Sequence, residues 1–239
     1  MIRRAMLLAL GLGMGLAMAT MPCPAVAQSS VVLWPVDPRI APGEQASALW
    51  LENRGKTPVT LQVRAFAWRQ PAGEDDYQRQ DAVVASPPIA EVGPGQRQLI
   101  RVIRRTADAA GEHAYRLLID ELPPPAPPAE AGVSAQLSVQ MRYSIPLFTY
   151  GSPQATARPA LTSRIEMADG KPWLAITNTG TGHARLTDLK QGGAVVRGGL
   201  VGYVLPGATM RWELPQQARL SAPLVITVNG SEQTLARSG

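Results

Sequence analysis

The stretch that decides the fold is SAQLSVQMRYSIPLF, which runs from Ser134 to Phe148. Its apolar and polar side chains alternate with a period of two, and successive side chains of a β-strand point to opposite faces. The stretch therefore predicts a two-faced strand over residues 134–146. The segment before it, LPPPAPPAEAG (122–132), cannot be a strand, because proline has no N–H to pair. The apolar or aromatic face of the predicted strand consists of Ala135, Leu137, Val139, Met141, Tyr143 and Ile145.

Shorter runs of the same kind fill the rest of the chain in two blocks. About seven lie between residues 31 and 148, and about six more follow GSPQATARP (151–159), a break typical of a linker. No window of useful length has the 3.6-residue period of an amphipathic helix. We therefore expect an all-β protein of two immunoglobulin-like β-sandwiches, with a single long barrel as the alternative.

The N-terminus has the pattern of a secretory signal peptide. MIRR is followed by an apolar run and by the cleavage motif Ala25-Val26-Ala27, so we expect residues 1–27 to be removed. An uncleaved membrane anchor is the alternative. The only cysteine, Cys23, leaves with this segment, so the mature chain has no disulfide and no cysteine metal site. Loss of Arg3 and Arg4 lowers the formal charge from +5 to +3.

The residues that usually carry catalysis are few and scattered. His113 and His183 both lie in polar, turn-like stretches, and no hydrolase, metal or nucleotide motif surrounds them. Asp75-Asp76 is predicted to be a solvated turn, with a calcium site as the alternative. Asp120 and Glu121 are neighbours on a predicted strand, so they point to opposite faces and cannot act as an acid–base pair. We expect a binding protein that is no enzyme and needs no cofactor or metal. Nucleic acid is not an expected partner, since no basic helix or aromatic–basic array is present.

Several strings, taken in order, resemble the periplasmic chaperones of the chaperone–usher pilus pathway over residues 30–235. The FAWRQ…GEDDY pattern, the YSIPLF strand end and the PPPAPP loop are most similar to the archaic, spore-coat-U-type branch. The strings are PRIAPGEQASALWLEN (38–53), LQVRAFAWRQPAGEDDY (61–77), VVASPPIAEVGPGQRQLIRV (83–102), YRLLIDELPP (115–124), VQMRYSIPLF (139–148), ITNTGTGHARLTDL (176–189) and YVLPG (203–207).

The resemblance implies an architecture and a set of partners. An N-terminal pilus-chaperone domain (28–150) and a C-terminal domain (151–239) would form an L or boomerang with a cleft between them. The chain would bind pilin subunits in the periplasm, prevent their premature polymerisation and deliver them to an outer-membrane usher, with no membrane insertion of the mature chain. The rival reading is a secreted two-domain structural or adhesive β-sandwich protein.

The resemblance also assigns the opening stretch a role. A pilin is similar to an immunoglobulin fold that lacks its last strand, and the chaperone completes it with its own edge strand. Residues 134–146 would be this donor strand, and the proline-rich segment before it a mobile cover. An ordinary strand with one face in its own core is the alternative. The contacts with the pilin would be made by Ala135, Leu137, Val139, Met141 and Tyr143.

In this family, basic residues in the cleft hold the C-terminal carboxylate of the pilin, which fixes the register of the donor strand. Arg39 lies near the anchor on the first strand. Ser144 takes the place of the lysine on the donor strand, and Arg142, two residues upstream, is our second candidate. Arginine suits the task because its guanidinium binds a carboxylate through two parallel hydrogen bonds.

Arg101 is the third candidate for the anchor. It shares a strand face with apolar residues, where a cation needs a partner. An internal salt bridge to Asp120 or Glu121 is the alternative. Arg116, in YRLLI, is similarly placed and ranks below these three.

Overall fold

The computed structural model describes residues 31–106, 110–123, 140–151, 157–216 and 223–237. The predicted signal peptide and the first part of the predicted donor strand, residues 134–139, lie outside the described residues. Within them the chain forms β-strands and one short 3-10 helix, η1 (Pro71–Gly73). No helix in this part of the chain is long and apolar enough to span a membrane.

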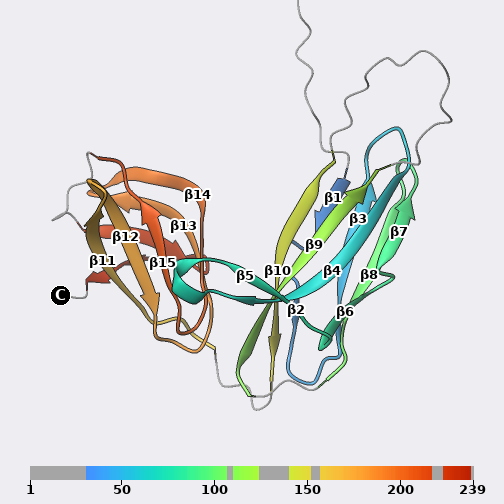
Figure 1. Cartoon of the computed structure of the whole chain (residues 1–239), viewed down its shortest axis with the longest axis horizontal. Coiled ribbons are helices and arrows are strands. Elements are labelled where there is room, and N and C mark those ends of the chain that lie inside the picture. Colours follow the sequence, from blue (N-terminus) through green and yellow to red (C-terminus); the bar gives the residue numbers. More distant parts are fainter. Residues whose placement is uncertain (1–30, 107–109, 124–139, 152–156, 217–222, 238–239) are drawn as a thin grey trace, which may run out of the picture.

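Four sheets pair into two β-sandwiches that are joined at an angle (Figure 1), which confirms the predicted fold class. In the first sandwich one sheet has the order β1-β3-β8-β6, and the other has the order β2-β10-β9-β4-β5, with β7 also paired to β4. The strands of the first sheet are β1 (Val31–Trp34), β3 (Ala46–Asn53), β8 (Arg97–Arg104) and β6 (Val83–Ser86). Those of the second are β2 (Arg39–Ile40), β10 (Arg142–Tyr150), β9 (Glu112–Leu122), β4 (Val59–Arg69), β5 (Asp76–Arg79) and β7 (Ile89–Val92).

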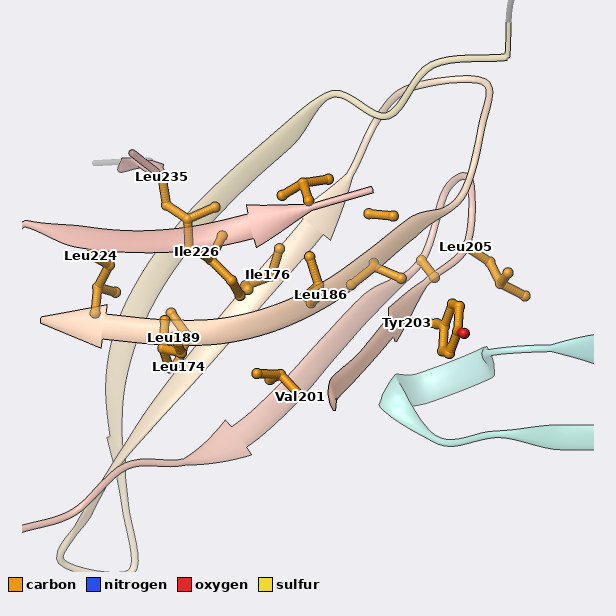
Figure 2. Packing of buried hydrophobic residues seen from close by; sticks show 14 of the residues in the cluster. Leu174, Ile176, Leu186, Leu189, Val201, Tyr203, Leu205, Leu224, Ile226 and Leu235 are labelled. Atoms are coloured by element: carbon orange, nitrogen blue, oxygen red, sulfur yellow. The ribbon is translucent and has the colours of Figure 1, made fainter. Parts of the chain in front are cut away.

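The second sandwich has sheets of the order β15-β12-β11-β18 and β14-β13-β16-β17. Its core is built from alternate apolar side chains of the central strands, such as Leu174, Leu186 and Ile226, which are fully buried (Figure 2). The strands are β11 (Leu161–Ala168), β12 (Lys171–Asn178), β13 (Ala184–Gln191), β14 (Ala194–Val204), β15 (Thr209–Glu213), β16 (Leu224–Val228), β17 (Ser231–Thr234) and β18 (Ala236–Arg237).

The first sandwich has ten strands where the sequence predicts about seven. The difference arises where prolines divide one apolar run between the two sheets. VVLW pairs with β3 in one sheet, and after Pro35 the chain crosses to pair Arg39–Ile40 with β10 in the other. The peptide bonds Trp34–Pro35 and Ser86–Pro87 are cis.

Candidate functional site

Strand β10 has one free edge. On one side it pairs with β9 along its whole length, from Arg142 opposite Asp120 to Tyr150 opposite Glu112. On the other side only two of its residues pair, in parallel, with the short strand β2. Among the described residues, positions 142–147 therefore have no neighbour on this side. An unpaired strand edge is a ready template for pairing with another chain.

The backbone groups that face this edge follow from the hydrogen-bond alternation of an antiparallel ladder. The N–H of Glu121 donates to the carbonyl of Met141 at 3.0 Å, so odd-numbered residues of β10 bond to β9. The groups of Arg142 and Ser144 therefore point to the free edge. Pro146 follows in the same phase and has no N–H, so the open ladder loses a donor there.

Of the five predicted donor-strand contacts, two lie within the described residues. Ala135, Leu137 and Val139 lie outside the described residues. Met141 precedes β10 and is 39% exposed. Tyr143 packs against the first core, and its hydroxyl donates to Glu121 Oε1 at 3.0 Å.

The continuation of the same face belongs to the core of the first sandwich. Ile145 and Leu147 are buried in the core of the first sandwich. Within the described residues the strand begins at Arg142, whereas the alternation predicts a strand from residue 134. The alternative of a strand with one face in its own core thus holds for Ile145 and Leu147.

The β4–β5 hairpin extends from the first sandwich to the second (Figure 1). At its tip Gln70 is nearly buried, and its side-chain amide bonds to the backbone of the second sandwich. Nε2 donates to the carbonyl of Tyr203 at 3.0 Å, and Oε1 accepts the N–H of Leu205 at 2.8 Å. Figure 2 shows this turn beside Tyr203. These two hydrogen bonds of the Gln70 amide therefore join the hairpin of the first sandwich to the backbone of the second.

Asp75 supports the hairpin through three side-chain hydrogen bonds. Its carboxylate accepts hydrogen bonds from Trp68 Nε1 at 2.8 Å, Gln70 Nε2 at 2.9 Å and the Tyr77 hydroxyl at 3.1 Å. Asp75 is exposed and lies in the turn before β5, as predicted for a solvated turn residue. Its carboxylate also orients the side chains that contact the second sandwich.

His183 forms a second contact between the sandwiches. The Glu112 carboxylate accepts the backbone N–H of His183 at 2.8 Å, and its other oxygen lies 2.8 Å from Nδ1 of the same residue. The imidazole stacks on the ring of Phe148, from β10. Burial, reinforced by the Glu112 charge, raises the pKa of the neighbouring Tyr150 well above its ordinary value. Nothing in the sequence indicates this contact, because both histidines stand alone.

Arg39 lies at a small cavity between the two sandwiches. The cavity has a volume of about 180 Å³ and is lined by residues of both. The Arg39 guanidinium is more than half exposed, and its nearest acid is Asp37, at 3.8 Å. The lining residues are Asp37, Arg39, Phe148, His183, Arg185, Tyr203, Asn229 and Gly230.

Arg142 lies at the opposite end of the free edge. It forms an ion pair with Asp120, whose other oxygen is 2.6 Å from Arg64 Nη2. Burial raises the pKa of Asp120, but the hydrogen bonds and charges of the two arginines outweigh it and leave the pKa below its ordinary value. Arg39 pairs with Phe148, six residues further along β10. At ~3.3 Å per residue this is about 20 Å, so Arg39 and Arg142 cannot hold the same carboxylate.

The structure does not bring Arg101 to either of these arginines. Arg101 is on β8, opposite Ala48 and Ser86, in the sheet that lacks β2 and β10. Its side chain is exposed on the outer face. The alternative of a salt bridge from Arg101 to Asp120 or Glu121 is not found among the described residues. Asp120 pairs with arginines of its own sheet, and Glu121 accepts the Tyr143 hydroxyl.

Arg116 is the buried arginine of this region. Its Cζ atom lies 3.7 Å from the centroid of the Trp68 ring and 5.2 Å from that of Tyr203. Arg116 is only 8% exposed, and its Nε has no hydrogen-bond partner. None of the ion pairs between described residues involves it. Sequence reasoning ranked Arg116 below the three exposed arginines, because burial at a contact between sandwiches leaves no local signal.

Comparison with known proteins places this geometry in a family. The model of the pili and flagellar-assembly chaperones, PapD N-terminal domain, matches residues 39–155. The chain belongs to the pilus-assembly chaperones. No curated protein matches its sequence.

Solved structures agree over both sandwiches of the chaperone. One is a chain of the CsuC–CsuE chaperone–tip adhesion subunit pre-assembly complex from the archaic chaperone–usher Csu pili of Acinetobacter baumannii. It is 28% identical with a TM-score of 0.73, and the match covers 88% of this chain and 100% of that one. The resemblance to the archaic branch is thereby confirmed.

More distant structures share the fold. The E. coli chaperone DraB is 17% identical with a TM-score of 0.62, over 87% of this chain and 97% of its own. A chain of the Salmonella enterica complex of SafA pilin with the SafB chaperone is 17% identical with a TM-score of 0.61. The match covers 88% of this chain and 99% of that one.

Proposed function

We propose that this chaperone binds pilin subunits in the periplasm by lending them the free edge of β10, and that it delivers them to an outer-membrane usher. The observation that carries the proposal is the edge at positions 142–147, which has no partner strand among the described residues, in a chain of this family. A secreted structural or adhesive sandwich has no need of such an edge, which argues against the rival reading.

The pilin would pair with this edge by β-augmentation, in which main-chain hydrogen bonds supply affinity and alternate side chains fill pockets. Arg142 and Ser144 would supply the backbone groups. Each large apolar side chain that enters the pilin groove would contribute roughly 1.5–3 kcal/mol, offset in part by the cost of ordering the segment. The proposed contacts are Ala135, Leu137, Val139, Met141 and Tyr143.

The position of Arg39 favours it as the anchor for the pilin's C-terminal carboxylate. It lies beside Phe148, at the end of the open ladder, where an anchored chain end would set the register of the whole pairing. Arg142 is less suited, because it is paired with Asp120. Arg101 is the least suited, because it lies on the opposite sheet.

Proline substitution at the free edge tests the proposal. Ser144→Pro removes an N–H that faces the client and leaves the bonds to β9 in place, so it should abolish co-purification of pilin from periplasm without lowering the melting temperature of the free chaperone. Ser144→Ala, which keeps the N–H, is the matched control and should bind as wild type does. Binding of pilin by Ser144→Pro at the wild-type level would contradict the proposal.

A further inference from the structure

We infer that Arg185, on the second sandwich, is a second arm of the carboxylate site and faces Arg39 across the cavity between the sandwiches. This inference rests on the proposed function and adds to it a residue from the other half of the protein. Both arginines line the same cavity of about 180 Å³. A carboxylate that enters it would meet one guanidinium from each sandwich.

The charge in the cavity is unbalanced in favour of an anion. Among the described residues that line it, Asp37 is the only carboxylate, and it lies 3.8 Å from Arg39. None of the ion pairs between described residues involves Arg185, although it is exposed on β13. Glu112 is already bound to His183, which lines the cavity. Two guanidinium groups against one acid would repel each other less when a further carboxylate lies between them.

The backbone of Arg185 is held in place by a tight turn. The Asn229 side chain accepts the N–H of Arg185 at 2.8 Å, and the backbone N–H of Asn229 donates to the carbonyl of Arg185 at 3.0 Å. Asn229 Nδ2 also donates to the carbonyl of His183 at 3.0 Å. Asn229 and Gly230 have φ of 49° and 89°, as the turn of a two-residue Asn-Gly hairpin requires. Arg185 is therefore fixed relative to His183.

The rest of the cavity suits the end of a polypeptide chain. Phe148 and His183, one from each sandwich, stack to form an aromatic surface, and Tyr203 lies 6.4 Å from Phe148 between ring centroids. These rings are nearly fully buried, so the exposed groups that a chain end would meet in the cavity are the two arginines. Because Arg39 and Arg185 come from different sandwiches, the bound chain end would also hold the two halves at a fixed angle.

A double-mutant design tests Arg185, with the pilin that co-purifies with the wild-type chaperone as the probe. Arg185→Ala should weaken binding of this pilin by about ten- to a hundredfold, the loss expected for charge-assisted hydrogen bonds. Arg185→Lys should recover part of it, because a lysine gives a point charge without the planar fork. Arg197→Ala, an exposed arginine of the same sandwich outside this cavity, is the control and should bind as wild type does.

The second experiment uses the same pilin extended by a few residues at its C-terminus. The extension should weaken the wild-type complex and add little to the loss in Arg185→Ala. Wild-type affinity of Arg185→Ala for native pilin, or an equal effect of the extension on both proteins, would overturn the role of Arg185. Failure of the proposed function gives a different result from failure of the Arg185 role. In the first case Ser144→Pro would bind pilin at the wild-type level, whether or not Arg185 is substituted.

Discussion

The imidazole of His183 lies flat on the ring of Phe148, with ring centroids 3.5 Å apart and planes 3° from parallel. Phe148 belongs to the strand that presents the free edge, and His183 to the second sandwich. The contact therefore joins the strand at which a pilin would pair to the second sandwich. Phe148 is counted among the buried residues of the second core although its strand belongs to the first sandwich.

Glu112→Ala should destabilise the chaperone, because it leaves the buried backbone N–H of His183 without an acceptor. An unsatisfied buried donor costs about 1–3 kcal/mol, measurable as a fall in the free energy of unfolding in urea. Glu213→Ala, which breaks the exposed pair with Lys171, is the control and should change little. Equal losses in the free energy of unfolding for the two substitutions would contradict a stabilising role of the Glu112 contact.

Gln70→Ala should loosen the junction between the sandwiches, because the N–H of Leu205 and the carbonyl of Tyr203 lose their partner. We expect a larger radius of gyration in X-ray scattering and faster proteolysis at the junction. Gln78→Ala, on the same hairpin but bonded through its side chain to Asp76 of the same strand, should leave both unchanged. A Gln70→Ala protein as compact and as resistant as wild type would contradict this role.

The stability contributed by Asp120 should depend on pH. Its pKa in the folded protein is below its ordinary value of 3.8, so the stabilisation is present above that pH and is lost as the pH falls through the folded-state value. Asp120→Asn should therefore be less stable than wild type at pH 7, and the difference should shrink under strongly acidic conditions. Urea unfolding at both pH values measures it, and a constant difference would show that the charge of Asp120 is not responsible.

The donor face makes a prediction that depends on side-chain alternation alone. Leu137→Asp should abolish pilin binding, because an unpaired charge is strongly unfavourable in an apolar groove. Ser138→Asp, its neighbour on the opposite face, should have a much smaller effect in the same pull-down. The reverse order would show that the faces are assigned wrongly. Unfolding of the free chaperone by Leu137→Asp would place the residue in the chaperone's own core.

The alternation in 134–148 predicted the strand that carries the edge, and the shorter runs of the same kind predicted the all-β fold, since side-chain period follows directly from backbone geometry. Pairing between distant strands could not be predicted in the same way. Arg101 shares a strand pattern with the other candidates, yet its strand lies in the opposite sheet. Local sequence does not encode which sheet a short strand joins.

The contacts between the sandwiches were beyond sequence reasoning for a related reason. Glu112 and His183 are 71 residues apart, and Gln70 and Leu205 are 135 apart. Each is an ordinary polar residue in its own segment. Only the folded arrangement shows that Gln70 is nearly buried against the other domain. Arg116 was ranked low for the same cause, because its burial depends on Trp68 and Tyr203 together.

Amide hydrogen exchange along β10 tests the central claim most directly. In the free chaperone, the N–H groups of Arg142 and Ser144 should exchange rapidly, because they face the open edge, whereas those of Tyr143 and Ile145 should be protected by β9. On binding pilin, Arg142 and Ser144 should become protected and the other two should stay so. If Arg142 and Ser144 exchange as fast in the complex as in the free chaperone, the pilin does not pair with this edge and the account is wrong.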